Sequence, residues 1–151
     1  MAKVNGMEWS TLTSELELVL DTFGHDQILI LQRRGTGRYV QLFVNRPGSL
    51  HIEASSNNYL TPEYVLTEQN EASLRALGWT PPSQGRAPNY STDLKGPRAT
   101  AQAAALTVRT LSEVLGTGSP ADLEYDAFEA KGRPMTLPPL KLERMKRQSR
   151  T

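Results

Sequence analysis

The strongest constraint on the fold is a pair of apolar segments joined by a glycine-containing turn. Residues 27–34 and 38–45 are rich in strand-forming residues, and each segment is too short for a surface helix. The turn between them contains Gly35 and Gly37, which tolerate the positive φ angles of a tight hairpin. These segments therefore predict two antiparallel strands.

Both faces of this hairpin are apolar, because side chains alternate between the two faces along a strand. One face carries leucine and valine side chains, namely Leu29, Leu31, Val40, Leu42 and Val44. The other face carries isoleucine and aromatic side chains, namely Ile28, Ile30, Tyr39 and Phe43. Helices of the chain can cover one face. The long final helix or the tail covers the second face, or another polypeptide does.

The remaining sequence predicts helices grouped around a short sheet. Apolar residues at helical spacing indicate helices over residues 7–23, 61–77 and 99–115, and a short helix over 120–128. Residues 50–55 alternate in polarity and predict a third strand, and residues 89–94 predict an edge strand. The expected fold is α+β: an antiparallel β-meander with an N-terminal helix, a middle helix and a long C-terminal helix.

The last part of the chain differs from the rest in charge. From Lys131 onward there are seven basic residues and one acid, whereas the preceding residues carry more acids than bases. Several prolines also occur there. With 151 residues in total, we expect one domain over residues 1–130, followed by a basic, proline-containing flexible tail over 131–151.

Most kinds of catalytic or metal site find no support in the sequence. The chain has no cysteine, and His25 and His51 show neither ligand spacing nor an obvious carboxylate partner. The acids between 122 and 129 do not match a calcium loop, and no glycine-rich phosphate loop is present. We expect no cofactor, no metal and no catalytic residues. An enzyme site assembled from distant residues is the weaker alternative.

No apolar run is long enough for a membrane span, and the first residues lack the uninterrupted apolar centre of a signal peptide. We therefore expect a soluble cytoplasmic protein.

Four short stretches carry a resemblance to a known family. They are residues 56–60 (Ser-Asn-Asn-Tyr-Leu), residues 74–79 (Leu-Arg-Ala-Leu-Gly-Trp), Pro82, and Asn89-Tyr90. The sequence resembles the YbjN-like and type III secretion chaperone-like (TY-Chap) domains common in actinobacteria, roughly over residues 7–128. The resemblance implies a compact α+β fold that holds unfolded or extended segments of partners without nucleotide hydrolysis. It supplies no catalytic residues, and the basic C-terminal extension has no place in its pattern.

The first functional hypothesis is a non-enzymatic, chaperone-like module that binds a polypeptide client or a twin subunit on an apolar sheet face. The expected site consists of Leu29, Leu31, Leu42 and Val44, with Arg33, Arg34 and Arg38 at the hairpin end steering acidic clients. Exposed arginines beside a turn are also an ordinary solubilising surface.

The alternative hypothesis is an adaptor for nucleic acid or another anionic surface, acting through the tail. Its expected contacts are Lys141, Arg144, Lys146, Arg147 and Arg150. The tail has no aromatic side chain to stack on bases, and the acidic body would repel the same polymer. A solubilising terminus is the other interpretation of these charges.

Overall fold

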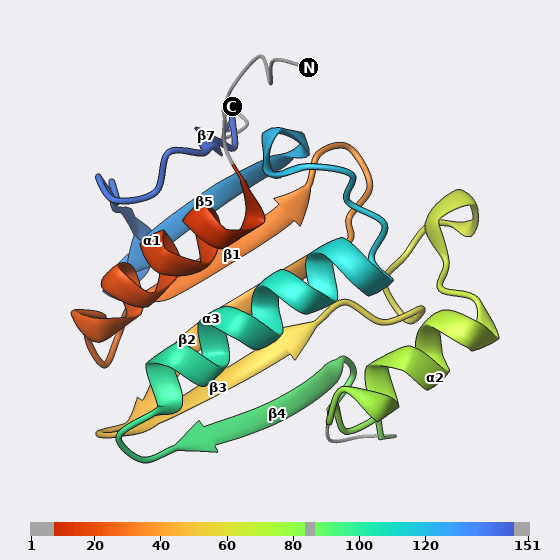
Figure 1. Cartoon of the computed structure of the whole chain (residues 1–151), viewed down its shortest axis with the longest axis horizontal. Helices are drawn as coiled ribbons and strands as arrows, with labels where there is room; N and C mark the ends of the chain where they lie inside the picture. Colours follow the sequence, from red (N-terminus) through yellow and green to blue (C-terminus); the bar gives the residue numbers. More distant parts are fainter. Residues whose placement is uncertain (1–7, 84–86, 147–151) are drawn as a thin grey trace.

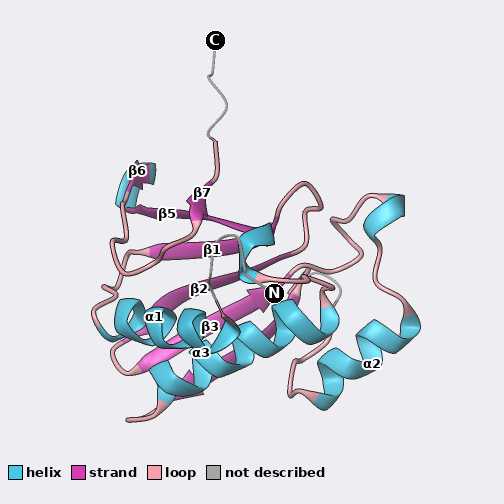
Figure 2. Ribbon diagram, turned by 45° about the horizontal axis from the view of Figure 1, so that its top comes forward, coloured by secondary structure: helices cyan, strands magenta, loops and turns pink. Residues whose placement is uncertain are grey.

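The computed structural model describes residues 8–83 and 87–146. Its helices are α1 (Trp9–Asp21), α2 (Glu68–Ala76) and α3 (Ala99–Arg109), and α3 continues into a π-helical turn, Thr110–Val114. Helices α1 and α3 lie side by side on one face of a sheet, and α2 packs beside the π-helical turn (Figures 1 and 2). The α+β class predicted from the sequence is confirmed.

The sheet is an extended meander. Its strands are β1 (Ile28–Arg33), β2 (Tyr39–Arg46), β3 (Ser49–Ala54), β4 (Tyr90–Lys95), β5 (Leu123–Glu129), β6 (Arg133–Pro134) and β7 (Glu143–Arg144). Neighbouring strands run antiparallel in the order β4-β3-β2-β1-β5-β6, and β7 adds to β5 in parallel. The hairpin turn has positive φ angles at Gly35 and Gly37, at 77° and 74°, as its sequence predicts.

The hydrophobic core lies between the sheet and the two helices that cover it. Buried side chains alternate along the strands, so only one face of each strand contributes to the core. The strand residues in this core are Leu29, Leu31, Val40, Leu42, Leu50, Ile52, Ala54, Tyr90, Leu123, Tyr125 and Ala127. Helix α1 contributes Leu12, Leu16, Val19 and Leu20. The sheet is therefore closed on its helix side.

The predicted helix over residues 61–77 is wrong in its first half. The chain forms a single 3-10 turn (Pro62–Tyr64), becomes extended, and starts α2 only at Glu68. Asn57 holds the extended part, because its side chain accepts from the backbone N–H of Leu66 at 2.6 Å and donates to Leu66 O at 3.1 Å. Thr67 and Asn70 then form a capping box that begins the helix anew.

The predicted helix over residues 120–128 is also wrong. A 3-10 turn (Pro120–Asp122) leads into strand β5. Leu123, Tyr125 and Ala127 are buried and alternate with half-buried residues, which is the period of a strand. Pairing along the whole length of β1 gives this segment its hydrogen bonds.

The expected flexible tail packs against the domain as far as the structure describes it. Leu137 and Leu140 are only 8% and 5% exposed and belong to the core. Short strands β6 and β7 both pair with β5. Part of the expected tail therefore contacts the domain, and residues 147–151 lie outside the described part. No helix within the described ranges is long and apolar enough to cross a membrane.

Candidate functional site

The sheet face opposite α1 and α3 presents apolar side chains that the core does not use. They are Ile28, Ile30, Tyr39, Phe43 and Phe128, and all five are half-buried. None belongs to the core, and none is among the partly buried apolar residues packed against it. We call this surface the open face. Single exposed apolar residues are common on proteins, but a contiguous group of them indicates a binding surface.

Strand register brings these side chains together. Ile28 lies opposite Phe43 on β2 and opposite Phe128 on β5. Ile30 occupies the next position on the same face of β1, and Tyr39 lies further along β2. The result is an apolar strip that crosses three neighbouring strands at Ile28, whereas Ile30 lies between Gln41 on β2 and Asp126 on β5.

Polar side chains of β3 and β4 border this strip. The His51 ring lies 5.0 Å from the Phe43 ring, centroid to centroid. Its Nδ1 is 2.8 Å from Asp93 Oδ1, and its Nε2 is 3.0 Å from Glu53 Oε2. The sequence shows no obvious carboxylate partner for His51, but the structure gives it two. Asp93 is its register partner on β4, and Glu53 is on the same face of β3 two residues later.

The border of the open face is mainly acidic. Glu53 and Asp93 lie at one side, on β3 and β4, and Asp126 and Glu124 lie next to Phe128 along the same face of β5, where Asp126 is opposite Ile30. Gln32 Nε2 donates to Glu124 Oε2 at 3.0 Å and fixes that carboxylate. This arrangement favours a ligand with positive charge at its ends. In the described part of the chain, no group of three or more histidine, aspartate or glutamate side chains could hold a metal ion.

A hydrogen-bonded network joins the open face to the asparagine turn found in the sequence. Asn89 Nδ2 donates to Tyr39 Oη at 3.0 Å and to Glu53 Oε1 at 3.3 Å, while its Oδ1 accepts from the Ser56 backbone N–H at 3.1 Å. Burial raises the pKa of Tyr39, so its phenol keeps its proton well above neutral pH. The network fixes one end of the apolar strip.

The other residues that carry the family resemblance also have structural contacts. Trp79 is buried, and its indole N–H donates to Thr110 Oγ1 at 3.0 Å where the π-helical turn begins. Tyr90 Oη lies 3.0 Å from Glu71 Oε2, and burial, followed by this carboxylate, raises the pKa of Tyr90 to about 12. These contacts hold α2 and the loop before β4 in place.

The leucines predicted as the binding face lie on the opposite side of the sheet. Leu29, Leu31 and Leu42 are 0% exposed, and Val44 is partly buried against the core. The prediction that these side chains are accessible to a client is therefore wrong. Both faces of the hairpin are apolar, so the sequence does not indicate which one the helices cover.

The side chains of the hairpin arginines donate hydrogen bonds to backbone carbonyls. Arg38 Nε donates to Tyr64 O at 2.9 Å, Nη2 donates to Val65 O at 3.0 Å, and Nη1 donates to Leu115 O at 3.2 Å. Burial, and then the neighbouring charge of Arg33, lowers the pKa of Arg38. Arg33 also donates to Leu115 O, at 3.4 Å. These contacts do not fit the expected role of steering acidic clients.

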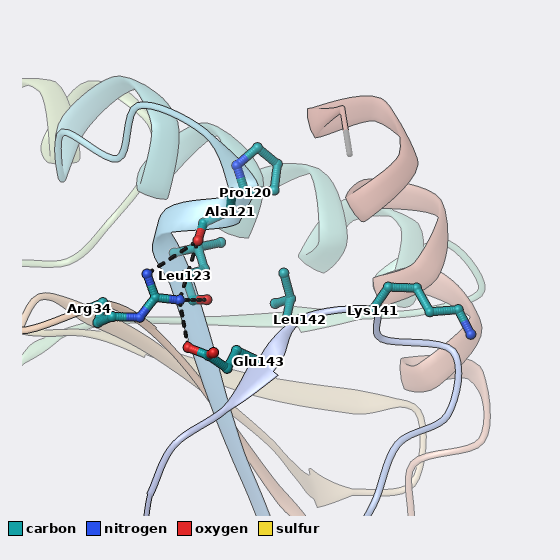
Figure 3. A pocket seen from close by; sticks show the side chains of 7 residues that line it. All are labelled: Arg34, Pro120, Ala121, Leu123, Lys141, Leu142 and Glu143. Atoms are coloured by element: carbon teal, nitrogen blue, oxygen red, sulfur yellow. Dashed lines mark hydrogen bonds and ion pairs between the residues drawn. The ribbon is translucent and has the colours of Figure 1, made fainter. Parts of the chain in front are cut away.

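Arg34 lies at a separate pocket of about 610 Å³ between the Pro120–Leu123 stretch and residues Lys141, Leu142 and Glu143 (Figure 3). Its guanidinium donates to Ala121 O and Leu123 O, each at 3.3 Å, and pairs with Glu143 at 3.0 Å. Arg34 therefore links the hairpin to the C-terminal part of the chain.

The basic residues proposed for anionic polymers are partly engaged within the chain. Lys141 Nζ donates to Pro138 O at 2.9 Å. The Arg144 guanidinium lies 5.7 Å from the centre of the Tyr125 ring and donates to Thr136 Oγ1 at 3.4 Å. Lys146 is exposed. Arg147 and Arg150 lie outside the described residues.

Comparison with known proteins gives one match, to a family model. Residues 3–129 match TY-Chap3, described as the T3SS (YopN, CesT) and YbjN peptide-binding chaperone 3. No curated protein and no solved structure matches the chain. The match covers most of the chain and includes the strands that build the open face, apart from the short strands after residue 129. The chain therefore belongs to the TY-Chap3 family of peptide-binding chaperones.

Proposed function

We propose that the protein is a non-enzymatic chaperone that holds a segment of a client polypeptide against the open face of its sheet. The observation that carries this proposal is the strip formed by Ile28, Ile30, Tyr39, Phe43 and Phe128, which lies outside the core. Burying such a strip under a client provides a favourable hydrophobic contribution without any chemical step. The family supports a polypeptide as the ligand.

The sheet edges offer less room than the open face. On β4, Thr80 and Ser91 exchange two backbone hydrogen bonds at 2.8 and 3.1 Å. On β5, the outer edge pairs with β6 and β7. Strand addition needs a row of available N–H and C=O groups, and both edges are paired over part of their length. We therefore place the client on the face.

The border of the open face defines the chemistry of the client. Glu53 on β3, Asp93 on β4 and Glu124 on β5 lie on the same face as the apolar strip. A client with apolar residues flanked by lysine or arginine would match both features, since opposite charges at the rim guide association and orientation. This is the reverse of the acidic client that the arginines suggested.

The absence of cysteine suits the reducing cytoplasm, where we expect the protein to act.

An array of immobilised peptides, each of about twelve residues, tests the proposal. At about 3.3 Å per residue, an extended peptide of this length can cross the strip. We expect the wild-type protein to prefer apolar peptides with basic flanks. Ile30→Glu should weaken binding by about tenfold or more, because a carboxylate in the strip removes about 1.4 kcal/mol or more of binding free energy.

Leu18→Glu is the matched control, because Leu18 is 60% exposed on α1, on the other side of the sheet. It should bind the same peptides within about twofold of wild type. Circular dichroism must show that both variants are folded. Equal loss in the two variants, or no loss in Ile30→Glu, would contradict binding at the open face.

The adaptor hypothesis has weaker support. Arg144 contacts Tyr125 and Thr136, and Lys141 contacts a backbone carbonyl, so neither presents a freely extended charge. No observation on the described residues favours a nucleic acid over a polypeptide.

A further inference from the structure

The C-terminal segment, residues 133–146, lies against the domain in the way that a bound peptide would. At its start, the Met135 N–H donates to Ala127 O at 2.8 Å, and near its end the Met145 N–H donates to Tyr125 O at 2.7 Å. Both acceptors are on the outer edge of β5. Between them the segment leaves the strand and inserts Leu137 and Leu140 into the core.

Helix α1 forms the other side of this binding groove. The Lys141 backbone N–H donates to Glu15 Oε1 at 3.2 Å, and Figure 1 shows the segment passing beside β5 and α1. Leu142 is partly buried against the core. The groove thus receives leucines at positions i, i+3 and i+5 of the segment, namely Leu137, Leu140 and Leu142. The segment turns at Pro138 and Pro139, where the Leu140 N–H donates to Leu137 O at 2.9 Å.

The segment is held by few backbone hydrogen bonds. Strands β6 and β7 contain two residues each, and Pro138 and Pro139 have no N–H to donate. The ion pair between Arg34 and Glu143 is exposed, with side chains 43% and 69% accessible, and contributes little. Arg144 Nε is buried without a hydrogen-bond partner among the described residues, which is unfavourable.

An open surface pocket of about 610 Å³ lies beside Lys141, Leu142 and Glu143 (Figure 3). The family match also ends at residue 129, before the segment begins. The segment therefore lies outside the part of the chain that the family model matches.

We propose that this groove is a second peptide-binding site, and that the C-terminal segment is its internal, displaceable ligand. The external ligand is a client segment with the same pattern: leucines at i, i+3 and i+5 with basic residues nearby. An internal ligand acts at an effective concentration of the order of millimolar, so only clients that bind more tightly or are abundant would displace it. This site lies at the edge of the sheet and is separate from the open face.

A labelled synthetic peptide with the sequence of residues 133–146 tests this proposal on the full chain. The variant Leu137→Ala/Leu140→Ala weakens the internal ligand and leaves the groove itself unchanged. Fluorescence anisotropy should show that the peptide binds this variant at least about tenfold more tightly than wild type. Pro138→Ala changes an exposed residue of the same segment and should behave like wild type.

Adding Ile30→Glu to the double variant should leave the affinity for this peptide within about twofold, which separates this site from the open face. A folded double variant that binds the peptide no better than wild type would overturn the proposal.

Hydrogen exchange on the wild-type protein gives a second test that needs no substitution. If the segment undocks while the domain stays folded, the amides of Met135 and Met145 should exchange at least about 100-fold faster than the hydrogen-bonded amides of β1. Equal exchange rates would show that the segment opens only when the whole domain unfolds, and would overturn the proposal.

Discussion

Arg38 joins three parts of the molecule that are distant in sequence. Its guanidinium donates to the carbonyls of Tyr64 and Val65 before α2 and to Leu115 after α3. Arg34 is more exposed, and its bonds to Ala121 and Leu123 are longer, at 3.3 Å. The two arginines look equivalent in sequence, but they differ in exposure and in the length of their hydrogen bonds to backbone carbonyls.

We predict that Arg38→Met lowers the free energy of unfolding by about 2 kcal/mol, because hydrogen bonds from a charged group to partly buried carbonyls are lost. Arg34→Met should cost less than about 1 kcal/mol, since its ion pair is exposed. Urea unfolding followed by circular dichroism measures both values. Equal costs for the two substitutions would show that Arg38 does not hold these segments together.

Residue types alone predict which positions alternate, but they do not predict every polar contact. The apolar character of Ile28 and Ile30 on one face, and of Leu29 and Leu31 on the other, follows from strand periodicity. The carboxylate contacts of His51 depend on the register of β3 and β4. A single sequence does not supply that register, so these contacts could not be predicted.

Among the elements, α2 shows how a local cap decides where a helix starts. Thr61 and Pro62 have the composition of a helix start, yet the Thr61 side chain makes no capping hydrogen bond. Thr67 accepts from the Asn70 backbone N–H at 3.0 Å, and the Asn70 side chain accepts from the Thr67 N–H at 3.0 Å. The helix begins after Thr67, six residues later than Thr61, because Asn57 keeps Leu66 extended.

We expect Thr67→Ala to lower the free energy of unfolding by about 1 kcal/mol, the usual cost of losing a helix cap. Thr61→Ala is the matched control and should change it by less than about 0.5 kcal/mol. Thermal or urea unfolding distinguishes the two. A larger effect at Thr61 than at Thr67 would contradict the capping seen in the structure.

The helix predicted over residues 120–128 is wrong for a different reason. The capping pattern of Ser119 and Pro120 is real, because the Ser119 hydroxyl accepts from the Ala121 N–H at 3.0 Å. It begins only a 3-10 turn. Leu123, Tyr125 and Ala127 alternate with Glu124 and Asp126 in the sequence. This pattern is typical of a strand on which the acids share one face, and the structure has that strand.

At the scale of the whole molecule, the sequence predicts the fold class but not the orientation of the sheet. An apolar hairpin, flanking helices and the family resemblance are enough for an α+β chaperone-like fold. Which apolar face the helices cover is a property of their joint packing. The position of the C-terminal segment also depends on packing. Its prolines and charges indicate a tail, but Leu137 and Leu140 become core residues because they lie beside β5 and α1.

The central claim is that a client binds to the face carrying Ile28 and Ile30. These residues and Ile52 are the three isoleucines of the chain, and Ile52 lies in the core with 0% exposure. Methyl-labelled NMR therefore reports on both faces of the sheet with three signals. On titration with the tightest peptide from the array, the signals of Ile28 and Ile30 should shift or broaden progressively, while that of Ile52 should stay nearly unchanged. Saturable binding that leaves Ile28 and Ile30 unshifted would contradict the claim.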